Sequence, residues 1–351
     1  MKKLISIFAA IVLSILTAQA EFPVKGIHFS APRSSDVEMC VKFINEELPK
    51  YGVNTMVLEI NYGYQYTSHP ELASGLSKEE LLSLYNACKE NNIEFIPMIN
   101  CLGHQSWARN THKLLTTYPE FDETPGKYPN NEDIYCRSYC PNHPEVHKVM
   151  FALMDELIEV THAKAFHVGL DEAFILADED CPRCGGKDPA EVFAHEVNTL
   201  SSHLKEKGIK MWMWGDRFLD GKITGIGKWE ASENGTAPAI HLVDKKNIVI
   251  CDWHYEKPHP TMIHFAVQGF DVLSSPWRKP EVALGQLQHI RLATQSSSEA
   301  VSARLQGMLH TTWCGMAPFV RAYHGQLVDS QRNRSAMETV ECFKTLFGEF
   351  Q

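Results

Sequence analysis

Apolar residues of this chain gather in eight short runs, and polar or helix-forming segments separate one run from the next. Each run has the length of a strand and is nearly continuously apolar, which is typical of parallel strands buried on both faces. We expect strands at residues 26–30, 55–60, 95–100, 165–170, 211–216, 248–253, 271–276 and 308–313.

Helical patterns occupy several intervals between these runs. Ser35 with Glu38, and Ser77 with Glu80, have the spacing of capping boxes at helix starts. Residues 191–204 show helical spacing, as does a last segment that should close the fold. Strands that alternate with helices predict an α/β protein, a (β/α)8 TIM barrel. An open doubly wound sheet fits less well, because no glycine-rich phosphate loop follows an early run.

The first twenty residues have the pattern of a signal peptide. Lys2 and Lys3 precede an apolar stretch at 4–16, and the small-x-small sequence that ends at Ala20 suits cleavage. We therefore expect export to the periplasm or the cell exterior and a single barrel domain at 21–351. The apolar stretch is short for a bilayer, and no other segment predicts a membrane span.

Charge narrows the class of partner. The chain has 33 Lys and Arg against 43 Asp and Glu, a formal net charge of −10, which argues against nucleic acid and anionic membranes. The longest irregular stretch, residues 110–142, follows the third run and should form a large loop over the barrel mouth.

Two adjacent carboxylates, Asp171 and Glu172, follow the fourth run. Barrel enzymes keep their catalytic groups where strands end, and a pair of carboxyl groups suits acid chemistry on sugars. An Asp-Glu pair is more often a solvated loop, but the buried strand before it favours an active site. Strand alternation places His167 on the same face as Asp171, pointing into the barrel, where core packing and a catalytic role both remain open.

Aromatic residues stand at the ends of the last four runs. Indole faces stack on the C–H faces of a sugar ring, so four such positions predict an aromatic pocket. The tryptophans are Trp214, Trp253, Trp277 and Trp313. Polar candidates for substrate binding at or just after run ends are Glu59, His104, Asp216 and Tyr255.

The stretch from His167 to Glu172 resembles the His-x-Gly-x-Asp-Glu signature of glycoside hydrolase family 20, the β-N-acetylhexosaminidases. Residues 26–29, 96–104 and 140–145 are also similar to that family, in its single-domain type that includes hexosaminidase D. The resemblance implies retaining hydrolysis of terminal β-linked GlcNAc or GalNAc from N-acetylated oligosaccharides or glycoconjugates. In that family the sugar's own 2-acetamido oxygen is the nucleophile, an exception to the two-carboxylate scheme.

The resemblance also implies roles. Asp171 would orient and stabilise the acetamido group, and Glu172 would serve as general acid and then general base. Tyr255 would hydrogen-bond the acetamido carbonyl, while Trp214, Trp253 and Trp313 would wall its methyl group. No cofactor is required by such a mechanism.

The sequence departs from the family pattern in the contacts to sugar hydroxyls. Leu170 replaces a usually small residue, and the first run lacks an arginine found in larger members. Cys314 and Gly315 follow Trp313 where many members have Trp-x-Glu. Glu59, Asp216 and Glu256 are possible substitutes.

Two alternatives to this enzyme remain open. The missing hydroxyl contacts fit a non-catalytic glycan-binding protein on the same barrel. A glycosidase for a different sugar would use Glu59 or Asp216 as its second carboxylate.

Ten cysteines occur, and four of them flank the fourth run in two closely spaced pairs. Cys136 with Cys140, and Cys181 with Cys184, could meet and bind a structural zinc through four thiolates. Disulfides across the two loops or unpaired thiols are the alternatives.

Overall fold

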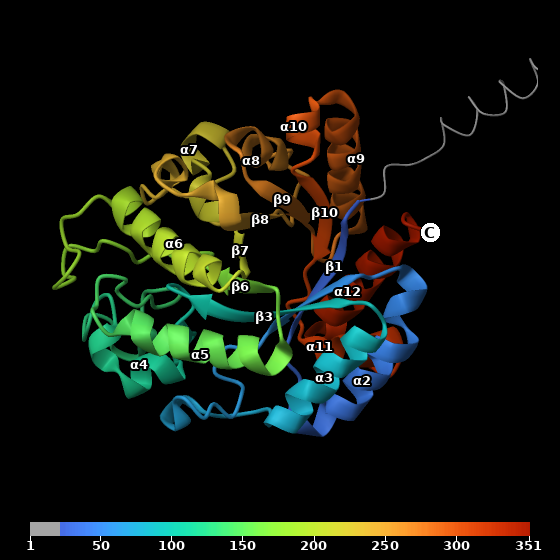
Figure 1. The fold of residues 1–351 in the computed structure, drawn as a ribbon, viewed down its shortest axis with the longest axis horizontal. Coiled ribbons are helices and arrows are strands. Elements are labelled where there is room, and N and C mark those ends of the chain that lie inside the picture. Colours follow the sequence, from blue (N-terminus) through green and yellow to red (C-terminus); the bar gives the residue numbers. More distant parts are fainter. Residues whose placement is uncertain (1–21) are drawn as a thin grey trace, which may run out of the picture.

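The computed structural model describes residues 22–351, and the predicted signal peptide lies outside this range. Eight parallel strands close into a barrel with the order β1-β10-β9-β8-β7-β6-β3-β2 (Figure 1). The strands are β1 (Val24–Ser30), β2 (Thr55–Glu59), β3 (Glu94–Cys101), β6 (Ala165–Gly169), β7 (Lys210–Trp214), β8 (Ile248–Trp253), β9 (Asp271–Ser275) and β10 (Leu305–His310). Each predicted run coincides with one strand, so the predicted (β/α)8 barrel is confirmed.

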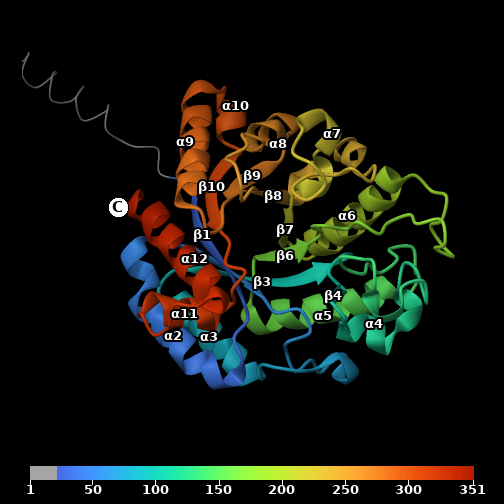
Figure 2. The same ribbon diagram turned by 180° about the vertical axis from the view of Figure 1, so that it is seen from behind.

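Helices cover the outside of the barrel. The longer ones are α2 (Val37–Glu46), α3 (Lys78–Glu90), α5 (Val146–Thr161), α6 (Pro189–Glu206), α8 (Met262–Gln268), α9 (Pro280–Ser296), α11 (Met316–Tyr323) and α12 (Gln331–Gly348). The short ones are α4 (Lys113–Thr117), α7 (Gly221–Thr224) and α10 (Glu299–Ser302), and a small hairpin pairs β4 (Ser106–Trp107) with β5 (Asn110–Thr111). Helix α12 contacts α9 and α11 and closes the ring of helices, as predicted (Figure 2). No helix within residues 22–351 is both long and apolar enough to cross a bilayer.

The two predicted capping boxes have different outcomes. Ser77 caps α3 as predicted, because its hydroxyl accepts from the Glu80 N–H and the Glu80 carboxylate accepts from the Ser77 N–H. The box at Ser35 does not form, since residues 34–36 make a 3-10 turn and α2 begins at Val37. The side chain of Asp36 pairs instead with Arg321 of α11, so a tertiary contact replaces the local cap.

Strand alternation divides the core into two parts. Phe166 and Val168 of β6 point outward, into the apolar layer between the barrel and its helices. Ala165 of β6 lies inside the barrel, where Trp212 and Trp214 of β7 belong to the same cluster. The large indoles fill the upper barrel interior and form a solid base beneath the strand ends.

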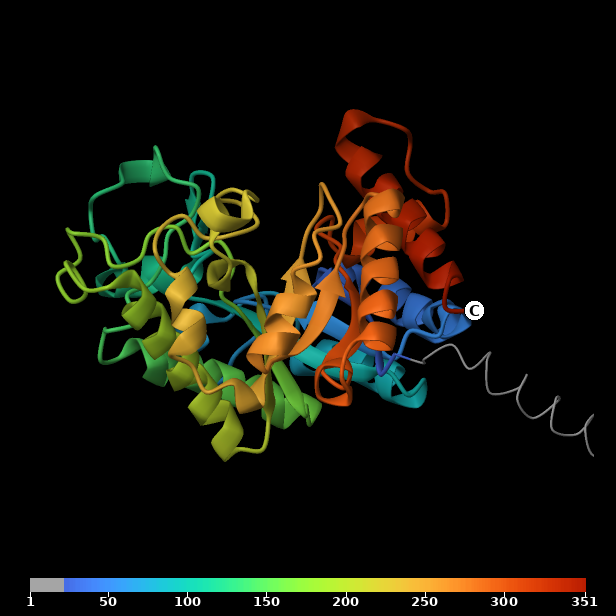
Figure 3. The ribbon, with the colours of Figure 1, turned by 90° about the horizontal axis from the view of Figure 1, so that it is seen from above.

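Two long connections rise above these strand ends. The segment from residue 102 to 145 joins β3 to α5, and the segment from 170 to 188 joins β6 to α6. Both stand on the side of the molecule opposite α9 and the C-terminal helices (Figure 3). They provide the walls of the site described below.

Barrel closure generates a prediction at Gly307, whose partner in the pairing of β10 with β1 is Val24. The φ of Gly307 is +129°, and a Cβ there would lie 2.2 Å from the Val24 carbonyl oxygen. We expect Gly307→Ala to lower the free energy of unfolding by about 2–4 kcal/mol, because overlap and strain coincide. Thermal or urea unfolding measures the loss.

The matched control is Gly348→Ala, at the end of α12, where an added Cβ meets nothing within 4 Å. Since alanine is the better helix former, this variant should be as stable as the parent or up to about 1 kcal/mol more stable. Equal stability of the two variants would contradict the assigned closure.

Candidate active site

A cavity of about 740 Å³ opens at the carboxyl ends of the barrel strands. Eight of the predicted site residues line it: Glu59, His104, Asp171, Glu172, Trp253, Tyr255, Trp277 and Trp313. The predicted residues His167, Trp214 and Asp216 are buried and do not belong to its lining. The structure therefore brings most of the predicted site together and places three members beneath its surface.

The backbone around the two carboxylates leaves strand geometry as soon as β6 ends. Leu170 has a φ of +74° and Glu172 a φ of +49°, both in a region that non-glycine residues rarely adopt. This turn lets consecutive side chains face one cavity, which an extended strand would not allow. Leu170, the departure from the family pattern, is fully buried in the layer between barrel and helices. Such strain is typical of functional sites.

His104 lies between the two carboxylates. Its Nε2 atom is 3.2 Å from Oδ2 of Asp171 and 3.3 Å from Oε2 of Glu172. A Cβ on Gly103 would lie 2.9 Å from the Asp171 carbonyl oxygen, so glycine permits the close approach of the two loops. Burial alone would lower the pKa of His104, but the charge of Asp171 and the closeness of both carboxylates raise it well above 6.5. The imidazolium form thus offsets the repulsion of two adjacent negative charges.

Asp216, a predicted substrate-binding residue, does not line the cavity and instead joins three strand ends from below. Its Oδ2 accepts the Glu172 N–H at 3.0 Å and the Arg217 Nε–H at 2.6 Å. Its Oδ1 accepts the indole N–H of Trp253 at 3.2 Å. Because the side chain is only 2 % exposed, Asp216 acts as a positioning residue for the turn at Glu172.

His167 and Trp214 form part of the base of the cavity. Their ring centroids are 4.5 Å apart, and both side chains are fully buried. Burial, with a smaller contribution from His28, lowers the pKa of His167 well below 6.5. The ring is therefore neutral, and its Nδ1 accepts the Gly169 N–H at 3.1 Å. These contacts favour the core histidine that the sequence left open.

Aromatic residues form one wall. Trp253 and Tyr255 lie 4.8 Å apart by ring centroid, and Tyr255 lies 5.4 Å from Trp277. The Trp313 indole N–H donates to the Tyr255 hydroxyl at 2.8 Å. Burial raises the pKa of Tyr255 well above 10, so the hydroxyl keeps its proton. Since its oxygen already accepts, this hydroxyl can donate toward the cavity.

A polar corner lies at the ends of β2 and β3. Glu59 Oε1 accepts from the side-chain amides of Asn61 at 2.9 Å and Asn100 at 2.7 Å, and Oε2 accepts from Ser30 at 2.7 Å. Both asparagines line the cavity, although sequence analysis did not select them. Their signal was present, because each follows or ends a predicted strand. Hydroxyl groups of a sugar are suitable ligands for such a corner.

Sequence analysis also did not select a group of aromatic residues at the rim of the cavity. Tyr135 lies 5.5 Å from Trp107 and 5.0 Å from Trp229 by ring centroid, and the two tryptophans are 56 % and 47 % exposed. All three residues lie in the long connections between barrel strands and helices, Trp107 in the short strand β4, where no local periodicity indicates which side chains face the mouth. Glu256, the remaining predicted hydroxyl contact, lines the outer cavity and pairs with Lys279 at 2.5 Å.

The predicted four-cysteine group needs one correction. Cys140, Cys181 and Cys184 meet, but Cys136 does not join them. Its sulfur lies 3.7 Å from the Glu172 carbonyl oxygen, because this part of the loop turns toward the active site. Glu123 takes the fourth place in the group.

A closed (β/α)8 barrel with paired carboxylates in an aromatic cavity at its strand ends is typical of enzymes that cleave glycosides. The sequence model described as glycosyl hydrolase family 20, catalytic domain, matches residues 53–303, so the chain belongs to that family. The resemblance noted from the sequence is thereby confirmed.

Individual relatives extend this comparison. The lacto-N-biosidase of Bifidobacterium bifidum is 30 % identical over 156 residues, which are 40 % of this chain and 13 % of that protein. The beta-hexosaminidase of Akkermansia muciniphila is 32 % identical over 111 residues, which are 31 % of this chain and 21 % of that protein. The matched regions thus span less than a quarter of either curated relative.

A solved structure gives the same fold. The X-ray structure of the Flavobacterium johnsoniae chitobiase aligns with a TM-score of 0.63 at 17 % identity, covering 94 % of this chain and 51 % of that chain. At this identity the likeness concerns the barrel alone.

His254 stabilises the loop that carries Tyr255 through contacts with two carboxylates. Its Nδ1 is 2.9 Å from Oε2 of Glu230, and its Nε2 is 3.3 Å from Oδ1 of Asp252. Glu230 also accepts the Tyr255 N–H at 2.9 Å. Burial lowers the pKa of His254, but Asp252 and Glu230 outweigh burial and raise it to about 9.

This arrangement predicts a stability difference that depends on pH. The folded pKa of His254 lies above the unfolded value near 6.5, so its protonation stabilises the folded state. This contribution to the free energy of unfolding is complete below pH 6.5, at roughly 3 kcal/mol, and is lost as the pH rises through about 9. His254→Gln should therefore unfold at a lower temperature than the parent at neutral pH, with the gap closing above pH 9. A surface control, His241→Gln, should follow the parent at every pH. A gap that widens with rising pH would contradict the assigned ion pairs.

Proposed function

We propose that the protein is an exported, retaining exo-β-N-acetylhexosaminidase that removes terminal β-linked GlcNAc or GalNAc from glycans. One observation carries the proposal: Asp171 and Glu172 face one aromatic cavity, and Oδ1 of Asp171, though buried, has no hydrogen-bond partner within residues 22–351. A buried carboxylate oxygen without a donor suits the N–H of a substrate amide. Family membership supports the same reaction class.

In the first step the acetamido oxygen attacks the anomeric carbon while the glycosidic C–O bond breaks. Glu172 gives a proton to the departing oxygen, and Asp171 accepts the acetamido N–H and stabilises the positive oxazolinium ion. His104 holds a proton 3.3 Å from Glu172 and can supply it to that carboxylate. The Tyr255 hydroxyl donates to the acetamido oxygen and aligns it.

In the second step Glu172 takes a proton from water, and the resulting hydroxide-like oxygen attacks the anomeric carbon. The C–O bond of the oxazolinium ring breaks and restores the acetamido group. Two inversions give net retention, and the nucleophile comes from the substrate. This scheme requires no cofactor.

The walls of the cavity match the parts of such a substrate. Trp253, Trp277 and Trp313 offer indole surfaces to the sugar ring and the acetamido methyl. The polar corner at Glu59 accepts from and donates to ring hydroxyls, in place of the family's hydroxyl contacts that this sequence lacks. The exposed rim of Trp107 and Trp229 meets the rest of the glycan. Export is supported by the pattern of residues 1–20.

The roles of the two carboxylates can be separated by the choice of leaving group. Glu172→Gln should lower kcat/KM about 10²–10⁴-fold on an alkyl β-N-acetylglucosaminide and far less on a nitrophenyl one, which needs little protonation. Asp171→Asn should lower kcat/KM on both substrates by similar factors, because the Asp171 carboxylate acts on the acetamido group and not on the leaving group. Steady-state kinetics measure the effects, and unfolding midpoints near that of the parent show that the variants fold.

Other outcomes would redirect the assignment. Glycan binding without turnover by the folded parent would indicate a carbohydrate-binding protein on the same barrel. Hydrolysis of a sugar without a 2-acetamido group, insensitive to a thiazoline mimic of the oxazolinium ion, would indicate a different glycosidase.

A further inference from the structure

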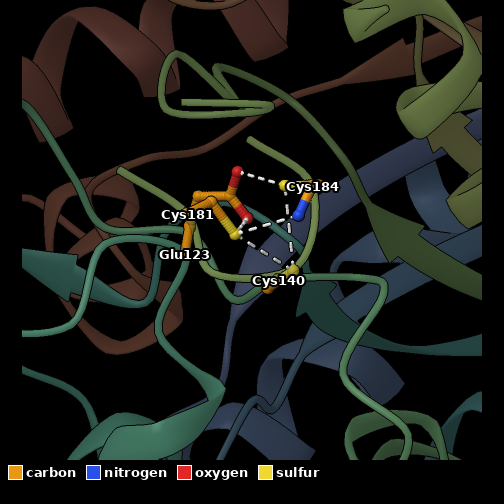
Figure 4. A group of neighbouring side chains, drawn as sticks. All are labelled: Glu123, Cys140, Cys181 and Cys184. Atoms are coloured by element: carbon orange, nitrogen blue, oxygen red, sulfur yellow. Dashed lines mark hydrogen bonds between the residues drawn. The ribbon is translucent and has the colours of Figure 1, made fainter. Parts of the chain in front are cut away.

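A second cluster of chemically reactive side chains lies outside the cavity. It contains Glu123, Cys140, Cys181 and Cys184, all buried (Figure 4). One ligand atom from each residue lies within 4.8 Å of every other. None of the four lines the cavity, and none takes part in the proposed reaction.

The sequence Cys181-Pro182-Arg183-Cys184-Gly185-Gly186 folds as a tight turn that directs two sulfurs to one side. The Cys184 N–H donates to the Cys181 sulfur at 3.4 Å, and the Gly185 N–H donates to the Cys181 carbonyl at 3.1 Å. A Cβ at Gly185 would lie 2.7 Å from that carbonyl oxygen, so the turn needs glycine. An N–H directed at sulfur favours a thiolate over a thiol.

The sulfur separations distinguish a metal site from a disulfide. The Cys140 sulfur lies 3.5 Å from that of Cys181 and 3.8 Å from that of Cys184. Bonded sulfurs stand about 2.0 Å apart. Two thiolates on one tetrahedral zinc, each about 2.3 Å from the metal, stand about 3.8 Å apart. The observed spacing therefore matches ligands of a shared ion.

Glu123 supplies an independent argument. Its side chain is 0 % exposed, and its oxygens face Cys184 at 2.7 Å and Cys181 at 3.4 Å. Its other hydrogen-bond partner in the described part of the chain is the Asp178 N–H at 3.3 Å. None of these partners carries a positive charge. Buried carboxylates are normally paired with a cation or bound to a metal.

We propose that Glu123, Cys140, Cys181 and Cys184 bind one Zn²⁺ ion. Three thiolates select a soft or borderline metal over Ca²⁺ or Mg²⁺, and zinc also accepts a carboxylate oxygen. Four protein ligands complete a tetrahedral shell and leave no position for substrate, so the ion is structural.

The ion would join the two long connections that form the cavity wall. Glu123 and Cys140 belong to the connection after β3, which also carries His104 and Tyr135, and Cys181 and Cys184 belong to the connection after β6. Zinc therefore holds the loop of His104 against the loop of the two carboxylates. Its presence does not depend on the proposed activity.

The first test is the metal content of the full chain, purified without chelator from zinc-supplemented medium. Elemental analysis should find one zinc per chain in the parent. Cys140→Ser and Cys184→Ser should lose it, whereas Cys136→Ser, on the same loop but outside the cluster, should keep it. The proposal would be overturned if the parent protein contained no zinc and its mass, measured under non-reducing conditions, showed disulfides among these cysteines. Full zinc retention by Cys184→Ser would overturn it as well.

The second test needs no variant and so does not depend on folding of a mutant. Thiol alkylation of the native parent, mapped by mass spectrometry, should spare Cys140, Cys181 and Cys184 until a chelator removes zinc, and added Zn²⁺ should restore protection. The buried Cys88 and Cys251 should stay unlabelled throughout and serve as internal controls. Labelling of the three cysteines that is the same with and without chelator would overturn the proposal, whatever the result of the activity assays.

Discussion

The site depends on one constraint, which is that two consecutive carboxylates must face the same cavity without driving each other apart. In an extended strand Asp171 and Glu172 would point to opposite faces, so the chain has to leave strand geometry directly after β6. The backbone does this at Leu170 and Glu172, and the Asp216 side chain holds the turn by accepting the Glu172 N–H. The remaining repulsion is offset by the imidazolium of His104 between the two groups.

The same constraint explains why glycine occurs beside the site. Gly103 lets the loop after β3 approach the Asp171 carbonyl, and Gly169 allows the end of β6 to pass the side chain of Asn100, whose oxygen a Cβ would meet at 2.5 Å. Larger residues at these positions would push the His104 loop away from the carboxylates. Local chain shape and the electrostatics of the site are therefore determined together.

Sequence patterns predicted the barrel well because strand burial and helix periodicity are local signals. The position of the two carboxylates at the cavity was also predictable, since Asp171 and Glu172 follow a buried strand. The orientation of Asp216 was not, because a strand end alone does not reveal which neighbouring N–H groups its carboxylate will accept. Glu123 was missed for a related reason: it lies in an irregular loop, and only the folded chain brings it to Cys184. The failed cap at Ser35 likewise reflects a partner that is distant in sequence.

The neutral base of the barrel has a consequence for the electric field in the cavity. Burial lowers the pKa of His167 well below 6.5 and also lowers the pKa of the neighbouring His28. These two histidines beneath the cavity thus add no positive charge, while the carboxyl groups of Asp171, Glu172, Glu59 and Glu230 line its walls. A ligand with positive charge on its ring would therefore be attracted by the walls of the cavity and would meet no opposing charge at its floor.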